Sequence, residues 1–364
     1  MSNTALNRIN RLGQSIWLDF IDRSILADGT LARLIQDDDL AGLTSNPAIF
    51  GKAIAMDGAY SEAIDRAAWL DVETLYTDLV IEDIAQAADL FLPVYQRTGA
   101  RDGYVSIEVS PLLARDTGAS ITEARVLWAR LKRPNIMIKI PGTEEGLTAI
   151  RTLLTEGINV NVTLLFSVSR YAQVMDIYLQ ALEARHAQGL PLSGIASVAS
   201  FFLSRIDVKI DALIDQQGSA LQSLRGRVAI ASAALAYRHF QTIIKSQRWH
   251  DLVSAGASVQ RLLWASTGTK DPAYSDIKYV EPLIAADTVN TLPMETLAAY
   301  RDHGEPALRI KEAMADADQV TAQLAEAGID LPAILAALEE EGIRKFIEPY
   351  QATLKTFERL RQAG

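Results

Sequence analysis

The chain of 364 residues carries a formal net charge of -10 and contains no cysteine, which excludes several classes of function. Without thiols there is no disulfide, no cysteine nucleophile and no cysteine-ligated metal. The negative charge disfavours non-specific binding to nucleic acid and to anionic membranes. The chain has no run of eighteen apolar residues, and its polar start does not resemble a signal peptide, so we expect no membrane span and a cytoplasmic protein.

Eight short runs bounded by turn residues are predicted to be strands, and most of them precede a helical pattern. In chain order they are 16–20, 42–46, 103–110, 135–140, 159–164, 194–202, 260–267 and 278–284. Eight strand and helix units in one chain favour an α/β fold of the (β/α)8 TIM barrel type. A doubly wound open sheet is the main alternative.

Two regions are predicted to add helices to this barrel. The segment 47–102 separates the second strand from the third and contains helical patterns such as 72–95, so we expect inserted helices rather than a linker. From 293 to the C-terminus the patterns are helical only. Since no low-complexity block or repeat divides the chain, we predict one domain over 1–364, with 293–364 packed on it as C-terminal helices.

The C-terminal helical region carries an apolar stripe at helical spacing. Its members are Ile334, Leu335, Leu338, Phe346, Ile347, Tyr350, Leu354 and Phe357. Such a stripe usually packs on the body of a domain. We also consider the hypothesis that the final helix lies across one end of the barrel and helps to cover a site there.

Several predicted strands carry polar residues on only one face. Successive strand residues point to opposite sides, so Ser106, Glu108 and Ser110 share a face. A strand buried on both sides reads instead as a continuous apolar run. The polar residues that we expect to meet inside the barrel, mostly late in their strands, are Asp19, Asn46, Glu108, Lys139, Asn161, Thr163 and Ser200. Because barrel sites form at the C-terminal ends of strands, this pattern predicts a site there.

Lys139 is the most informative of these residues. It lies in the apolar strand 135–140, which stops at Pro141-Gly142 before a helix that opens at Thr143. Burial disfavours an ammonium group, so a lysine in such a strand either pairs with a carboxylate for structural reasons or serves as a free amine. A free amine attacks a carbonyl and forms a Schiff base. Polar residues from six strands favour this carbonyl chemistry over a purely structural pair.

Histidine chemistry is not expected. All four histidines lie in helical or loop patterns, at His186, His239, His250 and His303. Neither a histidine base nor a histidine-rich metal site is therefore predicted.

Seven short motifs, in this order, resemble the transaldolase family of class I Schiff-base aldolases in the pentose phosphate pathway. They are Trp17-Leu-Asp-Phe20, Leu43-Thr-Ser-Asn-Pro47, Ser106-Ile-Glu-Val109, Ile136-Met-Ile-Lys-Ile-Pro141, Asn161-Val-Thr-Leu-Leu-Phe-Ser167, Val198-Ala-Ser-Phe-Phe-Leu-Ser-Arg-Ile-Asp207 and Trp264-Ala-Ser-Thr-Gly-Thr-Lys270. The resemblance implies a (β/α)8 barrel that transfers dihydroxyacetone reversibly from sedoheptulose 7-phosphate or fructose 6-phosphate to glyceraldehyde 3-phosphate or erythrose 4-phosphate. No metal or organic cofactor is implied.

The resemblance also implies roles for the polar residues. Lys139 forms the Schiff base with the donor ketone. Asp19 is the general acid/base at the hydroxyl whose proton leaves when the carbon–carbon bond breaks. Glu108, with Thr163, positions and activates a water. The residues implied to bind the dihydroxyacetone part are Asn46, Asn161 and Ser200.

Phosphate binding is implied for Arg205, which follows the sixth predicted strand. The second contact departs from the family pattern, because many relatives carry an arginine where this chain reads Ser266-Thr-Gly-Thr-Lys270. Ser266 matches, and Lys270 is a substitute that offers a point charge rather than a bidentate fork. The alternative for both cations is a solvated surface charge.

Phe202 bears on the outcome of the reaction. It shares a strand face with Ser200, and related fructose 6-phosphate aldolases have a hydroxylated ring there, so Phe202 favours transfer over free aldol cleavage. A stand-alone aldolase and a catalytically silent sugar phosphate binder remain alternatives. Because the chain ends at Gly364, we expect no fused isomerase domain and only one activity. A monomer and a homodimer are both open.

Overall fold

Eight parallel strands pair in chain order, and β8 pairs back with β1, so that the sheet closes on itself. The computed structural model describes residues 4–56, 58–66, 69–217 and 219–363. The strands are β1 Gln14–Asp19, β2 Gly42–Thr44, β3 Tyr104–Glu108, β4 Ile136–Pro141, β5 Val160–Leu165, β6 Ser197–Phe202, β7 Arg261–Ala265 and β8 Thr288–Leu292. The predicted (β/α)8 TIM barrel is confirmed, and the doubly wound alternative is wrong.

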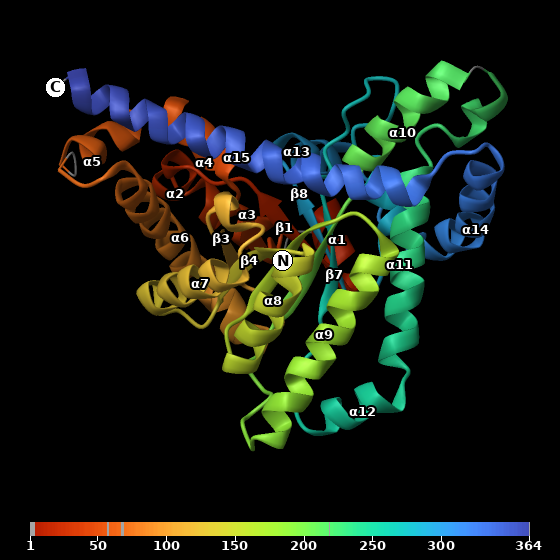
Figure 1. Ribbon diagram of the computed structural model, residues 1–364, viewed down its shortest axis with the longest axis horizontal. Coiled ribbons are helices and arrows are strands. Elements are labelled where there is room, and N and C mark those ends of the chain that lie inside the picture. Colours follow the sequence, from red (N-terminus) through yellow and green to blue (C-terminus); the bar gives the residue numbers. More distant parts are fainter. Residues whose placement is uncertain (1–3, 57, 67–68, 218, 364) are drawn as a thin grey trace.

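Helices surround the barrel, and the last of them, α15, crosses one end of it (Figure 1). The α-helices are α1 Ala5–Arg11, α2 Arg23–Ala27, α3 Thr30–Asp37, α4 Pro47–Met56, α5 Ser61–Arg66, α6 Val72–Arg97, α7 Thr117–Leu131, α8 Glu144–Glu156, α9 Val168–Ala187, α10 Ser204–Gln217, α11 Val228–Ile244, α12 Gln247–Ser254, α13 Met294–His303, α14 Ile310–Glu326 and α15 Leu331–Ala363. Single turns of 3-10 helix are η1 Gly58–Tyr60, η2 Pro111–Leu113 and η4 Glu281–Leu283, and η3 is Ser219–Leu224.

The expected extra helices are present in both places. Between β2 and β3 the chain forms α4, η1, α5 and α6, and after β8 it forms α13, α14 and α15. Local capping explains where the inserted α6 begins, and it acts in the same way at α8 of the regular barrel. The Asp71 side chain accepts a hydrogen bond from the amide of Thr74 at the start of α6, and Thr143 accepts one from Gly146 at the start of α8. These oxygens satisfy amide groups that have no partner within the helix.

The predicted eighth strand, 278–284, is wrong. This segment is a turn followed by η4, and the strand lies further on at Thr288–Leu292. The segment 278–284 is apolar because it packs into the core as a connection, and Pro282 lacks the amide that a central strand needs. The true strand was missed because it is polar: the buried Thr288 and Asn290 donate hydrogen bonds to the carbonyls of Ala285 and Tyr279 in the preceding connection.

An ion pair occupies the end of the barrel where the strands begin. Arg261 Nη2 lies 2.8 Å from Asp102 Oδ1, and the same guanidinium donates to Ser15 Oγ at 2.8 Å and to the carbonyl of Arg101 at 2.7 Å. Burial makes an ion pair costly unless further hydrogen bonds complete it. This pair is completed, so we assign it a structural role.

α15 packs against α4, α6 and α10, and it runs over the end of the barrel where the strands stop (Figure 1). Among the described residues no single helix is long and apolar enough to cross a membrane. Only α14 and α15 taken together reach that length and composition, with a bend of 97° between them.

Asp207 links α10, α11 and the connection between β7 and β8 through hydrogen bonds. It lies in α10, and its carboxylate accepts hydrogen bonds from the amide of Ala229 in α11 at 2.8 Å and from the hydroxyl of Tyr279 at 2.9 Å. Burial raises the pKa of Asp207 from its ordinary value near 3.8 to about 6, although these two hydrogen bonds oppose the shift. Ionisation of Asp207 in the folded protein therefore lowers the free energy of unfolding.

We predict that Asp207→Asn changes how stability depends on pH. Because the native state keeps this proton to higher pH than the unfolded chain does, the free energy of unfolding falls as pH rises from about 4 to about 6. Asparagine cannot ionise, so the variant should gain about 2 kcal/mol relative to wild type between pH 4 and pH 7. Urea unfolding across this range measures the gain. A difference between the two proteins that is constant with pH would contradict the prediction.

Candidate active site

The strands end around a cavity of about 80 Å³ at the side of the barrel that α15 crosses. The structure brings eight of the predicted site residues to its wall, namely Asp19, Asn46, Lys139, Thr163, Ser200, Phe202, Arg205 and Ser266. Glu108 and Asn161 lie directly behind them, in contact with Lys139 and Ser200 respectively. The polar faces of the strands thus meet at the C-terminal ends of the strands, as the alternation of polar and apolar residues predicted.

The Lys139 amine lies at the centre of this group. Its Nζ donates to the carbonyl of Ser45 at 2.9 Å and lies 3.3 Å from Glu108 Oε2. The side chains of Lys139 and Glu108 are only 6% and 4% exposed. Pairing of β3 with β4 sets Glu108 opposite Lys139, so the backbone register fixes the contact.

Both carboxyl groups near the amine hold their protons more strongly than usual. Burial raises the pKa of Glu108, and the charge of Lys139 offsets only part of this effect. Burial likewise raises the pKa of Asp19, at the end of β1, and the charges of Lys139 and Arg205 oppose the shift. The site therefore holds two proton acceptors in different surroundings, which is the arrangement that acid/base chemistry requires.

Glu108 also faces a second, smaller cavity of about 30 Å³, and Asn46 lines both cavities. A space needs only about 10–15 Å³ to hold one water molecule. The second cavity can thus accommodate water beside the Glu108 carboxyl group.

A chain of hydrogen bonds supports one wall. Ser200 Oγ donates to Asn161 Oδ1 at 2.7 Å, and Asn161 Nδ2 donates to Ser106 Oγ at 3.0 Å. The three residues come from β6, β5 and β3. The chain orients Ser200 toward the cavity, while Asn161 itself is fully buried.

Asn46 was predicted inside a strand, and this is wrong. β2 ends at Thr44, and Asn46 follows it as the residue before α4. Its Oδ1 accepts hydrogen bonds from the amides of Ala48 and Ile49, each at 3.0 Å. Asparagine is favoured at such a helix start, so the strand pattern stops earlier than the apolar run suggests.

The backbone is strained on two sides of the cavity. Leu164, at an irregularity in β5, has a φ of 60°, and Ser266, just after β7, has a φ of 54°. Such angles cost side-chain-bearing residues roughly 1–3 kcal/mol and concentrate at functional sites. Next to Leu164, the buried Thr163 hydroxyl has no hydrogen-bond partner among the described residues.

Arg205 is held by aromatic rings instead of a carboxylate. Its guanidinium carbon lies 5.2 Å from the ring centre of Phe202 and 5.6 Å from that of Phe346. Nη1 is buried without a hydrogen-bond partner in the described part of the chain. Burial lowers the pKa of Arg205. The guanidinium is thus a desolvated cation that faces the cavity, not a solvated surface charge.

Lys270 is the one predicted site residue that stays apart. It is exposed on the connection between β7 and β8 and does not line the cavity. Its Nζ lies near Gly268, 3.4 Å from the point where a Cβ on that glycine would be.

Five residues of the wall were missed by the sequence analysis, namely Thr44, Leu263, Ala265, Thr291 and Phe346. Thr291 belongs to β8, whose position was predicted wrongly. Phe346 comes from α15, and its ring centre lies 5.8 Å from Lys139 Nζ. The apolar stripe contained Phe346, but helical spacing does not reveal which member of a stripe reaches a distant site.

Comparisons with known proteins show the family of this chain. The family model described as Transaldolase/Fructose-6-phosphate aldolase matches residues 16–357. "Transaldolase 2" of Nostoc sp. strain PCC 7120 is 46% identical over 372 residues, covering 98% of each chain. "Transaldolase" of Thiobacillus denitrificans is 46% identical over 349 residues, covering 95% of this chain and 97% of its own. "Transaldolase" of Saccharopolyspora erythraea is 45% identical over 366 residues, covering 100% and 99%. The chain belongs to the transaldolase and fructose 6-phosphate aldolase family.

Proposed function

We propose that this protein is a transaldolase of the non-oxidative pentose phosphate pathway in the cytoplasm. It transfers dihydroxyacetone reversibly from sedoheptulose 7-phosphate or fructose 6-phosphate to glyceraldehyde 3-phosphate or erythrose 4-phosphate. The observation that carries the proposal is the surroundings of Lys139. A buried amine 3.3 Å from Glu108 shares one site with Asp19 and with the desolvated guanidinium of Arg205.

Lys139 is the nucleophile in this proposal. Its amine attacks the donor ketone, a carbon–nitrogen bond forms, and loss of water leaves the protonated imine, which accepts electrons from the neighbouring bond. Glu108 takes the amine proton across 3.3 Å and returns it to the departing hydroxyl. Its raised pKa suits this exchange, and the adjoining cavity has space for the water that later reverses the step.

Asp19 acts on the other side of the imine. It accepts the proton of the substrate hydroxyl as the carbon–carbon bond breaks and returns that proton when the new bond forms. Burial raises the pKa of Asp19, which strengthens it as a base. Two carboxyl groups can thus perform separate proton transfers around one imine.

The remaining residues bind substrate. Ser200, oriented by Asn161, and Asn46 hydrogen-bond the hydroxyl groups of the three-carbon unit. A phosphate oxygen would give Arg205 Nη1, which has no partner among the described residues, a charge-assisted hydrogen bond. For Ser266 and Lys270 we propose further contacts to the same phosphate, with Lys270 reaching it from the exposed connection.

Lys139→Met tests the assigned nucleophile. Methionine retains most of the side-chain volume but cannot form an imine, so transfer from fructose 6-phosphate to erythrose 4-phosphate should fall by at least about 1,000-fold. Lys311→Met, which removes an exposed lysine from α14, is the matched control and should keep full activity. A Lys139→Met protein that retains more than about 1% of transfer would rule out the proposed role.

The same assay separates transfer from free aldol cleavage, the alternative function within this family. Wild type should form sedoheptulose 7-phosphate when the acceptor is present and should release little dihydroxyacetone when it is absent. Phe202, which lines the cavity without a hydroxyl group, supports this expectation. Rapid release of dihydroxyacetone without acceptor would instead favour the aldolase.

Thr163→Val should separate function from stability. The Thr163 hydroxyl is buried with no hydrogen-bond partner in the described part of the chain, so an isosteric methyl group should leave the free energy of unfolding unchanged or raise it by up to about 1 kcal/mol. If the hydroxyl helps to position the catalytic water, kcat should fall by about tenfold or more. Thr163→Ser, which keeps the hydroxyl, should restore most of the activity. Unchanged kcat in Thr163→Val would remove this residue from the mechanism.

A further inference from the structure

α15 contributes an aromatic ring to a site otherwise built from the barrel and the segments that follow its strands. Phe346 is 4% exposed, and its ring centre lies 5.8 Å from Lys139 Nζ and 5.6 Å from the guanidinium carbon of Arg205. Of the described residues of α15, Phe346 alone lines the cavity that contains Asp19. The ring thus covers the amine from outside the barrel.

The approach of α15 to the barrel depends on a glycine one turn before the ring. A Cβ on Gly342 would lie 2.9 Å from Leu164 Cδ2 and 3.5 Å from Arg205 Nη1. The first distance is shorter than real Cβ contacts allow. A helix with a larger residue at this position would have to move, or Leu164 would have to change its rotamer, so Gly342 lets the backbone come close enough for Phe346 to reach the cavity.

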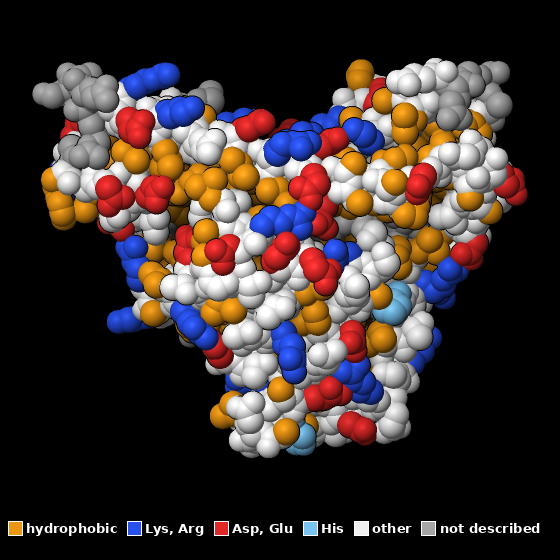
Figure 2. Space-filling view, in the orientation of Figure 1, with side chains coloured by type: hydrophobic (Ala, Val, Ile, Leu, Met, Phe, Trp, Pro, Cys, Tyr) orange, Lys and Arg blue, Asp and Glu red, His pale blue; other side chains and the backbone are white. Residues whose placement is uncertain are grey.

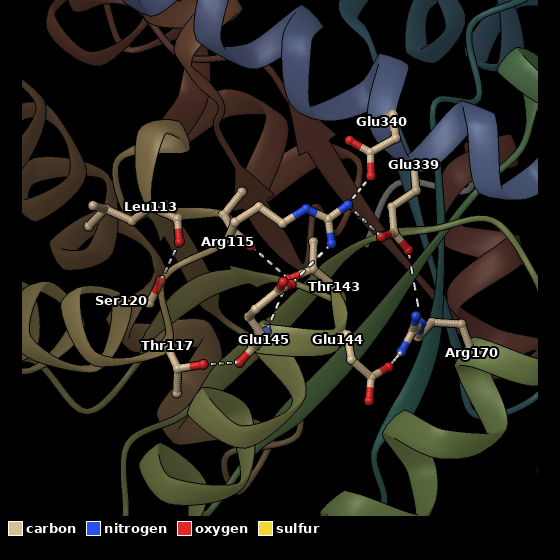
Figure 3. Close-up of polar contacts among 12 residues, drawn as sticks. Leu113, Arg115, Thr117, Ser120, Thr143, Glu144, Glu145, Arg170, Glu339 and Glu340 are labelled. Atoms are coloured by element: carbon tan, nitrogen blue, oxygen red, sulfur yellow. Dashed lines mark hydrogen bonds and ion pairs between the residues drawn. The ribbon is translucent and has the colours of Figure 1, made fainter.

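Ion pairs hold the same part of α15 against the barrel helices. Figure 3 shows Arg115, from the loop after β3, between Glu145 of α8 and the pair Glu339 and Glu340 of α15. Arg170 of α9 lies between Glu144 and Glu339. The α15 members of these pairs, Glu339 and Glu340, lie just before Gly342 in the chain. They hold α15 down close to the position from which Phe346 enters the site.

The ion pairs between α15 and the barrel helices can break and re-form. The Arg115 side chain is 41% exposed and that of Glu340 is 54% exposed, and ion pairs at such exposure contribute little individually. Figure 2 shows acidic and basic side chains next to one another where α15 crosses the front of the molecule. Surface ion pairs thus add to the buried contacts of Leu338, Ile343 and Phe346 in holding α15 here, whereas the strand ends that form the opposite wall are fixed by the barrel.

The size of the cavity favours such opening. About 80 Å³ is well below the roughly 300–1,000 Å³ of typical small-molecule sites. Movement of part of the wall would enlarge the space available to a sugar phosphate. Phe346 and α15 form the part of the wall that is not built into the barrel, so their displacement admits the substrate and their return encloses it.

We propose that Phe346 is a specificity-determining residue, which closes over the three-carbon intermediate on Lys139 and keeps water from it until an aldose acceptor arrives. This inference rests on the proposed function. Closure that excludes water prevents hydrolysis of a reactive intermediate. The ratio of transfer to hydrolysis then depends on α15 as well as on the barrel.

Two reactions compete for that intermediate, the enamine left on Lys139 after cleavage. In transfer, the enamine carbon forms a bond to the aldehyde carbon of the acceptor. In hydrolysis, the same carbon takes a proton, water adds to the imine carbon, and the carbon–nitrogen bond breaks. Hydrolysis thus consumes one water and releases dihydroxyacetone and the lysine amine, without oxidation or reduction.

The test measures dihydroxyacetone released per sedoheptulose 7-phosphate formed, with fructose 6-phosphate as donor and saturating erythrose 4-phosphate as acceptor. Because the acceptor is saturating, a weaker affinity of Arg205 for the acceptor phosphate does not change the measured ratio. Phe346→Ala should raise this ratio by about tenfold, because the smaller side chain admits water. Phe357→Ala is the matched control, since Phe357 is fully buried in α15 but does not line the cavity. Its ratio should equal that of wild type.

An unchanged ratio in a Phe346→Ala protein that still performs transfer would overturn the inference. So would an equal rise in Phe357→Ala, because the cause would then be general loosening of α15. If Phe346→Ala does not fold, Phe346→Leu decides, with an expected rise of about threefold and an unchanged ratio as the contrary result. Absence of transfer in wild type would defeat the proposed function itself, and the inference with it.

Discussion

The buried pair of Lys139 and Glu108 is the constraint on which the rest of this structure depends. Two charged groups with almost no exposure are expensive unless they are close and further hydrogen-bonded. The register of β3 and β4 sets them opposite each other, and the carbonyl of Ser45 takes a second hydrogen bond from the amine. The barrel therefore supplies the geometry that makes a buried amine tolerable, and the same geometry places that amine where a carbonyl substrate can reach it.

Buried polar groups lie at both ends of the barrel. Where the strands begin, Arg261 and Asp102 form an ion pair that further hydrogen bonds complete. Where the strands end, the Thr163 hydroxyl and Arg205 Nη1 have no hydrogen-bond partner among the residues that the structure describes, and Leu164 has strained backbone angles. Proteins accept such local costs where function needs groups that are free to bind. Those at the strand ends, Thr163 and Arg205, line the same cavity as Lys139.

Much of this arrangement followed from the sequence, because strand alternation has a period of two residues. That period put Glu108 and Lys139 on inward faces, and the barrel brought those faces together. The eighth strand could not be found in the same way, since an apolar connection at 278–284 imitates a strand and the polar Thr288–Leu292 does not. Asn46 was misplaced because a helix cap directly follows a short strand. The reach of Phe346 depends on how α15 crosses the barrel, and no local pattern encodes that crossing.

Trapping the intermediate tests the central claim most directly. Wild type is incubated with fructose 6-phosphate and borohydride, which reduces an imine to a stable amine, and the product is analysed by intact mass and peptide mapping. The account predicts a three-carbon adduct on the peptide that contains Lys139, and no adduct in Lys139→Met. Absence of any adduct on wild type under turnover conditions, or an adduct on a different lysine, would contradict the account.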